Sequence, residues 1–295
     1  MDFIALRKIF YTISGAFVLV SGVALVVWGL PLGIDFTGGS LMELEFSGSI
    51  PSQEMVHNQL ASFSLGEVQI QQTGERGIII RMRDLDEETH QRVLGSLRTA
   101  DSNILEKRFV SVGPVIGGEL KRRAVWALVL VLVMIIAYIA VAFRHVSHPI
   151  SSWKYGVVAI IALIHDVVIP TGLFVYLGQF HGVEINALFI SALLTILGFS
   201  VHDTIVVFDR VRENLRKHNG ANFKETVNVS IRETITRSIN TSLTLLFVLL
   251  TLFFFGGEST RYFSLALIVG TVVGVYSSIF IASPLLVTWQ KWSSK

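Results

Sequence analysis

The stretch of sequence that decides the fold is Leu197-Gly198-Phe199-Ser200-Val201-His202-Asp203-Thr204-Ile205-Val206-Val207-Phe208-Asp209-Arg210. It begins as an apolar segment typical of a membrane helix, contains a His-Asp pair, and ends in charged residues. An ionisable side chain at the centre of a membrane helix costs a few kcal/mol or more, so such residues usually mark ion or proton routes. The stretch therefore predicts a membrane helix that carries a functional polar site.

Few other ionisable side chains interrupt the apolar parts of the chain. A second His-Asp pair, His165 and Asp166, lies in another apolar segment, and Arg237 lies where a later one begins. We expect Asp166 and Asp203 to face the interior of a helix bundle, because adjacent residues on a helix point about 100° apart and only one of each pair can face a given neighbour.

The composition places the chain among membrane proteins. Of its 295 residues 52% are hydrophobic and only 16% are charged, and the mean hydropathy is +0.61. A soluble domain has about 25% charged residues. The net charge of +2 is too small to suggest nucleic-acid binding, and the absence of cysteine excludes disulfides and thiolate metal sites.

Apolar runs of about 20 residues, long enough to cross a bilayer, recur six times. The first is too long for the 7–15-residue core of a signal peptide, so we expect it to be an uncleaved span. We place the spans at 9–30, 124–143, 155–177, 185–208, 239–255 and 263–289.

Basic residues predict the orientation of these spans. They gather before the first span, between the second and third, between the fourth and fifth, and at the end of the chain, whereas the opposite short loops contain only Arg261. By the positive-inside rule both termini are cytoplasmic. The basic residues concerned are Arg7, Lys8, Arg144, Lys154, Arg210, Arg212, Arg216, Lys217, Lys224, Arg232, Lys291 and Lys295, with His145 beside them.

Residues 33–123 then form one domain outside the membrane. Residues 40–46 alternate between apolar and acidic side chains, as a strand does, and residues 74–76 form a turn between two further strand-like runs. With helices expected near 51–63 and from a cap at Asp84 or Asp86 to about 100, and a last strand at 104–112, the order is β-α-β-β-α-β. This order is typical of a ferredoxin-like α+β fold. The domain shows no set of residues typical of catalysis.

Two glycine-bearing stretches bracket this domain, at residues 33–39 and 112–120. Glycines allow sharp turns and close approach of backbones, but a plain linker would have the same composition. The spacing alone leaves both interpretations open.

Residues 209–236 are predicted to form a cytoplasmic loop that contains one short helix, 222–236. Its apolar residues recur at every fourth position, from Phe223 to Ile235, with charged residues between them. This pattern predicts a helix lying on the inner leaflet, and docking on a partner is the alternative.

Asp203 and Arg237 are expected at a similar depth. In a low-dielectric site the arginine favours the charged form of a nearby carboxylate, whereas the loss of water disfavours it. This balance suits a proton carrier. The alternative is a static ion pair. Asp166 could instead serve only to accept hydrogen bonds from hydroxyl groups of neighbouring helices. We do not expect a metal site, because neither His-Asp pair has the i, i+4 spacing of helical metal ligands.

Several of these stretches together resemble the SecD/SecF family of protein-export membrane proteins, within the resistance-nodulation-division superfamily. The resemblance covers almost the whole chain. It is carried by residues 33–40, 112–120, His165-Asp166, 198–214, Arg237 and Asn240-Thr241-Ser242.

This resemblance implies half of a twelve-helix bundle in the bacterial inner membrane, completed by a SecD partner. It implies use of the proton motive force to promote translocation of unfolded preprotein through the SecYEG translocon after ATP-driven initiation, with a YidC-type insertase as a further partner. No cofactor is implied; the coupling ion is a proton, with Na⁺ as an alternative.

The resemblance also implies roles for particular residues. Asp203 and Arg237 match the family's proton-pathway carboxylate and its basic partner, to which we add His165 and Asp166. His202 stands where the family usually has Asn, and since His can titrate near neutrality it is a candidate second relay. The remaining residues that match family motifs are Gly33, Asp35, Phe36, Gly38, Gly39, Gly113, Pro114, Gly117, Asp209 and Arg210.

Two other functions stay open. The chain could be half of a proton-coupled exporter of small molecules or lipids, which would need an apolar pocket in the external domain. It could also be an assembly factor that only stabilises the translocase. We do not expect an enzyme, since no nucleophile and base are paired in the sequence.

Overall fold

A computed structural model describes residues 2–48, 50–99, 103–143, 151–217 and 222–293. Arg144, His145 and Lys295, which contributed to the predicted orientation, lie outside these residues. The chain divides into two compact units, residues 32–125 and residues 1–31 with 126–295. The described part of the chain has six helices that are long and apolar enough to cross a membrane.

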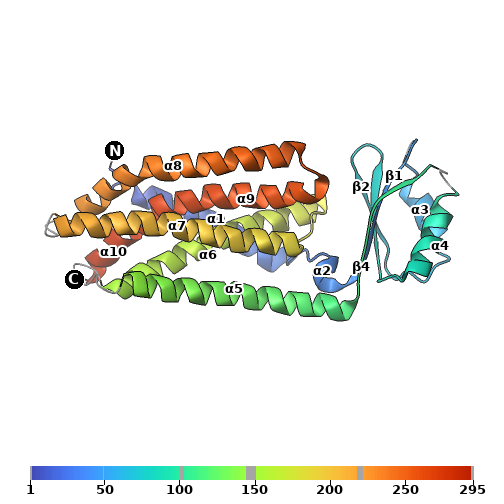
Figure 1. Ribbon diagram of the computed structural model, residues 1–295, viewed down its shortest axis with the longest axis horizontal. Coiled ribbons are helices and arrows are strands. Elements are labelled where there is room, and N and C mark those ends of the chain that lie inside the picture. Colours follow the sequence, from blue (N-terminus) through green and yellow to red (C-terminus); the bar gives the residue numbers. More distant parts are fainter. Residues whose placement is uncertain (1, 49, 100–102, 144–150, 218–221, 294–295) are drawn as a thin grey trace. The chain divides into compact units, whose positions relative to one another are not determined.

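The unit of residues 32–125 is an antiparallel sheet covered on one face by two helices (Figure 1). Its strand order is β2-β3-β1-β4, with β1 paired to both β3 and β4. This is the ferredoxin-like arrangement expected from the sequence. The elements are α2 (Ile34–Thr37), β1 (Gly39–Glu45), α3 (Gln53–Leu60), β2 (Gln69–Thr73), β3 (Gly77–Met82), α4 (Glu87–Leu97) and β4 (Leu105–Val112).

The alternating pattern of β1 explains the core of this unit. Met42 and Leu44 are fully buried, as is Ile80 on β3. They pack with Val56 of α3 and Val93 of α4 in a single apolar cluster. Because successive strand residues point to opposite faces, the polar residues between them line the face that the helices leave uncovered.

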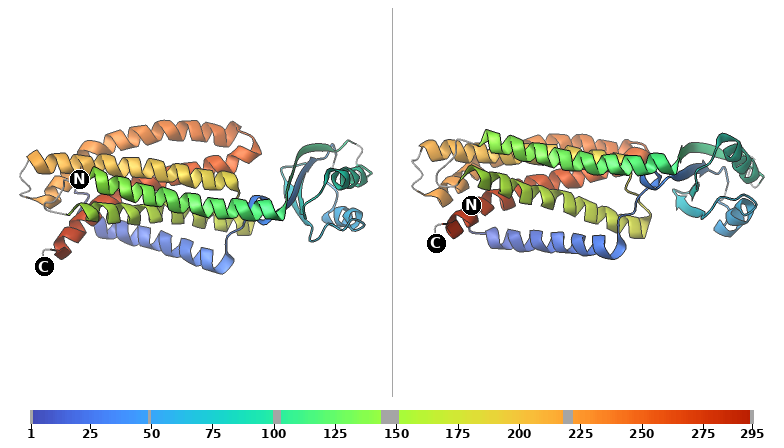
Figure 2. Two further views of the ribbon diagram at one scale, coloured as in Figure 1. Left: turned by 60° about the horizontal axis from the view of Figure 1, so that its bottom comes forward. Right: turned by 90° about the horizontal axis from the view of Figure 1, so that it is seen from below.

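The other unit is a bundle of long helices (Figures 1 and 2). The first and last helices begin and end at the same end of the bundle, as an even number of spans requires. The helices are α1 (Arg7–Trp28), α5 (Pro114–Ala142), α6 (Ser152–His181), α7 (Ala187–Lys217), α8 (Phe223–Phe255) and α9 (Glu258–Ser277), which continues through a π-helical turn (Ser278–Ala282) into α10 (Ser283–Ser293).

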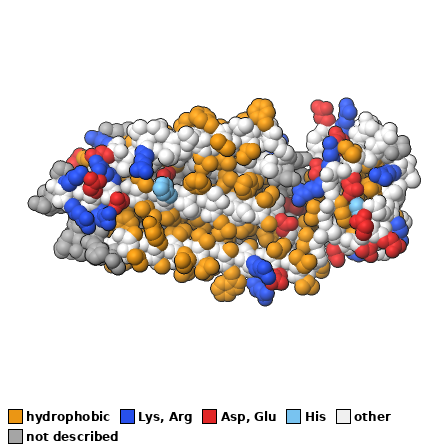
Figure 3. Space-filling view, in the orientation of Figure 1, with side chains coloured by type: hydrophobic (Ala, Val, Ile, Leu, Met, Phe, Trp, Pro, Cys, Tyr) orange, Lys and Arg blue, Asp and Glu red, His pale blue; other side chains and the backbone are white. Residues whose placement is uncertain are grey.

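Three helices form the centre of this bundle. α9 packs against α6, α7 and α8, and α1 packs against α6. About half of the apolar segment is buried in α6, in α7 and in the last span, compared with 6% in α5 and 11% in α8. Figure 3 shows apolar side chains over most of the bundle surface, with charged ones gathered at one end and near the start of α5. The outer helices therefore present surfaces suited to lipid or to another membrane chain.

Small residues bring α7 and α9 close together. A side chain at Gly270 would collide with Ile196, and one at Gly274 would meet Ser200 at 3.2 Å. The Gly270-xxx-Gly274 pattern is thus the contact face of α9 on α7, as such patterns are in membrane helices.

For the described residues 209–217 and 222–236, the prediction of a loop with a separate interfacial helix is wrong. α7 continues past Phe208 to Lys217, and α8 runs without a break from Phe223 to Phe255, with Asn222 as its N-cap. The apolar residues Phe223, Val227 and Ile231 are buried in the main core of the bundle rather than placed at its surface. The apolar face packs on the protein's own α7 and N-terminal segment, because both helices extend beyond the apolar spans.

The boundary of the second span also differs from the prediction. α5 begins at Pro114, so the glycine-bearing stretch 112–120 is mostly its first turns rather than a linker. Proline is well placed there, because the first helical position needs no backbone N–H donor.

Candidate functional site

Asp166 lies near the middle of α6 and is fully buried. Its carboxylate accepts hydrogen bonds from three side chains: Nδ1 of His165 at 2.9 Å, Oγ of Ser277 at 2.7 Å, and Oγ of Ser200. Ser200 belongs to α7 and Ser277 is the last residue of α9. One carboxylate therefore joins the three central helices. This agrees with the alternative role given above for Asp166, in which it accepts hydrogen bonds from hydroxyl groups of neighbouring helices.

A second hydroxyl pair lies next to this cluster. Thr204 Oγ1 and Ser278 Oγ are 2.8 Å apart, and Ser278 also donates to the backbone carbonyls of Gly274 and Ser200. Ser278 is the first residue of the π-helical turn. Such turns occur often at functional sites, since the extra residue breaks the regular i→i−4 pattern of hydrogen bonds.

Asp203 lies on the neighbouring part of α7 and is 8% exposed. It lines a cavity of about 220 Å³ between α7, α8 and α9. The described residues form no hydrogen bond or ion pair with its carboxylate. The other lining residues are Phe199, Ser200, His202, Thr241, Ser242, Leu245, Gly270, Thr271, Gly274 and Val275. The cavity thus places one carboxylate among several hydroxyl groups.

Arg237 is close enough to Asp203 for an electrostatic interaction but forms no ion pair with it. Its side chain is exposed on α8, one turn before Thr241 of the cavity lining. His202 also lines the cavity and is exposed. The static ion pair considered as an alternative is therefore not formed among the described residues. The side chains of Arg237 and His202 instead lie on an outer surface of this bundle.

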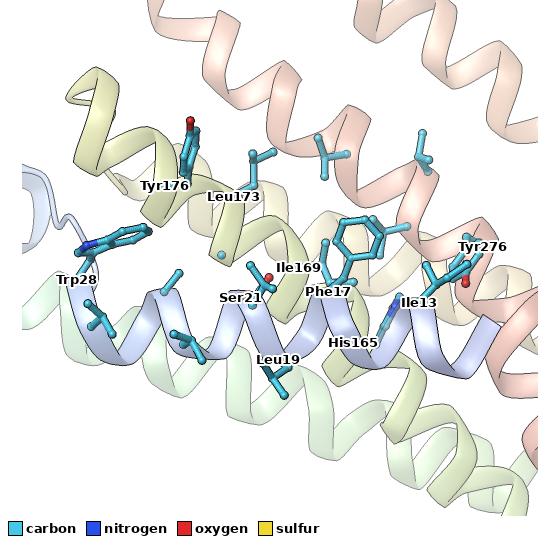
Figure 4. A pocket seen from close by; sticks show the side chains of 18 residues that line it. Ile13, Phe17, Leu19, Ser21, Trp28, His165, Ile169, Leu173, Tyr176 and Tyr276 are labelled. Carbon is cyan, nitrogen blue, oxygen red and sulfur yellow. The ribbon is translucent and has the colours of Figure 1, made fainter. Parts of the chain in front are cut away.

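His165 faces away from the cavity, toward a groove of about 770 Å³ between α1, α6 and α9. Figure 4 shows His165 and Tyr276 near Ile13 and Phe17, with Trp28 toward the other end. Nε2 of His165 is buried and has no hydrogen-bond partner among the described residues. The lining is otherwise almost entirely apolar, so this side of the cluster is shielded from water.

The two glycine-bearing stretches, residues 33–39 and 112–120, belong to the unit of residues 32–125 and pack against each other. Gly38 has a φ of 76°, and a Cβ there would lie 2.7 Å from Cα of Pro114. A Cβ at Gly117 would lie 2.8 Å from the backbone nitrogen of Gly38. This backbone contact shows that the stretches are not plain linkers. Phe36 is buried beside them, Gly33 precedes α2, Asp35 is in its first turn, Gly39 begins β1, and Gly113 precedes Pro114.

Asp209 and Arg210 lie in the extension of α7 beyond the apolar segment. Arg210 pairs with Glu213 on its own helix and with Glu233 of α8, at 2.7 Å from Nε to Oε2. Asp209 pairs with Arg212. Arg210 therefore ties the ends of α7 and α8 together, at some distance along α7 from Asp203.

The sequence analysis missed four polar residues of this site: Ser200, Thr204, Ser277 and Ser278. Ser200 could have been predicted from its spacing, since it lies three residues before Asp203 and must share its helix face. Nothing in the sequence pointed to the serines of the last span. Within the described residues no three His, Asp or Glu side chains are placed to hold a metal ion.

The chain matches two family models. The model "Protein export membrane protein SecD/SecF, C-terminal" matches residues 93–292, and the "SecD/SecF GG Motif" matches residues 23–50. The chain belongs to the SecD/SecF family. Within that family it is a SecF-type translocase subunit and a multi-pass membrane protein, as the resemblance had indicated.

Curated SecF relatives match this chain over nearly its whole length. It is 42% identical to protein translocase subunit SecF of Thermobaculum terrenum, over 98% of this chain and 94% of that protein. It is 38% identical to protein translocase subunit SecF of Synechocystis sp., over 100% and 96%.

Solved SecDF structures share the fold. SecDF of Thermus thermophilus, described as a translocon-associated membrane protein, has a TM-score of 0.85 at 34% identity. A SecDF in a super-membrane-facing form has a TM-score of 0.69 at 33% identity. The matches cover 99% and 100% of this SecF-type chain, but only 39% of each SecDF chain. The matched part thus belongs to longer chains named SecDF, which supports membership of the Sec machinery together with SecD.

Proposed function

We propose that this SecF-type chain uses the proton motive force to promote preprotein translocation after ATP-driven initiation. The observation that carries the proposal is the position of Asp203. Its carboxylate is almost buried in a membrane helix, lines a small cavity with hydroxyl groups, and forms no ion pair among the described residues. A carboxylate in such a site can take up and release a proton when water enters or when Arg237 moves.

The energy available is sufficient for a conformational step. One charge crossing 100 mV of membrane potential supplies about 2.3 kcal/mol. This amount shifts a two-state equilibrium by a factor of about 50, which is enough to change which of two domain arrangements is populated. The external domain would then convert the change into movement of a preprotein on the outer face of the inner membrane.

The exposed polar groups of the bundle support a membrane partner. His202 and Arg237 lie on outer surfaces of membrane helices, and α5 and α8 are little buried within this chain. Charged groups facing lipid are costly, so a SecD-type bundle that covers them would complete a twelve-helix assembly. SecYEG, a YidC-type insertase and unfolded preprotein are the further partners in this proposal, and both termini are cytoplasmic in it.

The exporter alternative has no support from the described residues. A shallow pocket along α3 in the unit of residues 32–125 is lined by Ser52, Glu54, Met55, Asn58 and Gln59. Four of these five side chains are polar, whereas an exporter of lipids or apolar molecules would need an apolar pocket.

The test is gradient-driven export into vesicles that contain this chain and its SecD partner. A proton gradient is imposed after ATP-driven initiation, and Asp203→Asn is compared with wild type. We expect the variant to assemble normally but to lose the gradient-dependent part of export. A parallel Na⁺ gradient without a pH difference identifies the coupling ion. If Asp203→Asn retains gradient-dependent export, or if it lowers export only by failing to assemble, the proposal is overturned.

A further inference from the structure

Ser200 is the residue that connects the two carboxylates of the bundle. Its Oγ donates a hydrogen bond to Oδ2 of Asp166, and the same residue lines the cavity that contains Asp203. Ser200 and Asp203 are three residues apart on α7, so they lie on the same helix face. Asp166 itself is fully buried and does not line the cavity.

We propose that Ser200 relays protons between the Asp203 cavity and the buried carboxylate of Asp166. The inference rests on the proposed proton coupling and adds a second protonation site to it. Ser200 is suited to this role because a hydroxyl can donate one hydrogen bond while it accepts another. It can therefore donate to Asp166 and at the same time accept from a water molecule in the cavity.

The relay step conserves atoms and charge. A hydronium ion or a protonated Asp203 delivers a proton to Oγ of Ser200, while the original Ser200 proton passes to Oδ2 of Asp166. Ser200 is again neutral afterwards, and Asp166 has become a neutral carboxylic acid. The new Asp166 carboxyl then donates to Oγ of Ser200, and the original hydrogen bond returns when Asp166 releases its proton and the Ser200 hydroxyl rotates back.

Ser277 provides a comparison within the same cluster. It donates to the same oxygen, Oδ2 of Asp166, at 2.7 Å, and it is fully buried. Unlike Ser200, it does not line the cavity, and its Oγ also contacts the carbonyl oxygen of Gly274. A purely structural role for Asp166 would make the two serines equivalent, whereas a relay requires only Ser200.

The ionisable groups around Asp166 are few among the described residues. His165 bonds to it from α6, and Tyr276 of α9 lies beside the His165 ring. On the cavity side are Asp203 and His202 of α7, with Arg237 of α8 within electrostatic reach of Asp203. α1 contributes only apolar and small residues to the groove near His165. The cavity is thus the side from which water can bring a proton.

Protonation of Asp166 would also act on the helix packing. A neutral carboxyl is a weaker acceptor than a carboxylate, so the hydrogen bonds from Ser200 and Ser277 would weaken together. Ser277 immediately precedes the π-helical turn of the last span. The relay would thereby link proton uptake in the cavity to a loosening of α9 from α6 at this turn.

A first test asks whether water reaches Ser200. The chain contains no cysteine, so Ser200→Cys and Ser277→Cys each introduce a unique thiol. The full chain with its SecD partner in vesicles is treated with methyl methanethiosulfonate, and labelling is followed by mass spectrometry. We expect Ser200→Cys to be labelled and Ser277→Cys to be protected. Equal labelling of the two thiols, or protection of the thiol at position 200, would overturn the proposal.

A second test measures the relay itself. After a pH jump, infrared spectroscopy follows the carboxyl band of Asp166, identified by its loss in Asp166→Asn. In Ser200→Ala we expect protonation to be roughly 100-fold slower than in wild type, the lower end of what a positioned proton-transfer group contributes. In Ser277→Ala the rate should stay near that of wild type. Equal rates in the two serine variants, or a wild-type band that does not respond to pH, would refute the relay.

These measurements do not depend on export. If Asp203→Asn retains gradient-driven export while Ser200→Ala slows Asp166 protonation, the proposed function fails and the relay stands. If Asp203→Asn abolishes gradient-driven export and the two serine variants behave alike, the proposed function stands and the relay fails.

Discussion

Ser277 Oγ donates a hydrogen bond of 2.7 Å to Oδ2 of Asp166, and this bond joins the end of α9 to the middle of α6. Both residues are fully buried. The same carboxylate is bonded by Ser200 of α7, so three helices meet at one side chain. The three helices therefore share one acceptor group next to the Asp203 cavity.

Replacing this acceptor should weaken the bundle. Asp166→Leu removes three hydrogen bonds and leaves the hydroxyl of Ser200 without its acceptor, whereas Ser277 keeps the carbonyl oxygen of Gly274. Hydrogen bonds between membrane helices contribute about 0.6 kcal/mol on average and up to about 1.7. We expect the free energy of unfolding to fall by roughly 2–4 kcal/mol in total. Unfolding in detergent micelles, followed by a steric-trap assay, measures this loss.

Asp166→Asn is the matched control. Its side-chain oxygen still accepts from one or two of the hydroxyls, and its volume is nearly the same, so the loss should be about 1 kcal/mol or less. If the Leu and Asn variants were equally stable, the carboxylate would not hold the three helices together.

The contact between the two glycine stretches gives a second prediction. A methyl group at Gly117 would lie 2.8 Å from the backbone nitrogen of Gly38, and a backbone atom cannot move aside easily. We expect Gly117→Ala to destabilise the unit of residues 32–125 by roughly 1–3 kcal/mol. Hydrogen exchange of β1 and β4 measures the effect, because both strands adjoin the contact.

The neighbouring glycine serves as the control for that variant. A Cβ at Gly118 would meet nothing within 4 Å, and the residue lies in α5. Alanine has a higher helix propensity than glycine, so Gly118→Ala should stabilise α5 by up to about 1 kcal/mol. Hydrogen exchange of β1 and β4 should then be unchanged or slower. Equal effects of the two variants would contradict a specific backbone contact at Gly117.

The contact between α7 and α9 gives a third prediction. A side chain at Gly270 would overlap the Ile196 side chain, whereas one at Gly198 on α7 would meet nothing within 4 Å. We expect Gly270→Ala to lower the unfolding free energy in micelles by roughly 1–3 kcal/mol, and Gly198→Ala to preserve or raise it. If Gly198→Ala lowered the unfolding free energy and Gly270→Ala left it unchanged, the close contact between α7 and α9 would not be at Gly270.

Local patterns in the sequence predicted the fold of residues 32–125 well. The alternation over residues 40–46 and the turn at 74–76 each depend on neighbours within a few positions. β1 and the β2–β3 hairpin form where these patterns indicated. The spans were also evident, because an apolar run of about 20 residues forms a helix as long as the hydrocarbon core of a bilayer is thick.

Helix ends and contacts between distant helices were less accessible. The charged residues after Phe208 indicate that the chain leaves the bilayer, but they do not end a helix, and α7 continues to Lys217. Hydropathy reports the surroundings of a helix rather than its length. Ser277 is 111 positions from Asp166. No periodicity relates positions so far apart, so the cluster became visible only in three dimensions.

A last prediction concerns the acid stability of the unit of residues 32–125. Asp86 is the N-cap of α4, and its carboxylate accepts a hydrogen bond from the backbone N–H of Thr89 at 2.8 Å. Hydrogen bonding by Thr89, first through its side chain and then through its backbone, holds the pKa of Asp86 below its ordinary value of 3.8. A carboxyl with a lowered pKa stabilises the folded state fully above the unfolded pKa. This contribution is lost as the pH falls below about 3.8 and through the lowered pKa.

We therefore expect α4 to lose hydrogen-exchange protection, corrected for intrinsic rates, when the pH falls from 5 to below about 3. Asp86→Asn keeps a side-chain acceptor at the cap but cannot titrate, so this part of the pH dependence should disappear while protection at pH 5 is retained. Asp86→Ala lacks the cap at every pH and should show reduced protection throughout. An acid response in Asp86→Asn as large as in wild type would mean that another carboxyl group controls the stability of this helix.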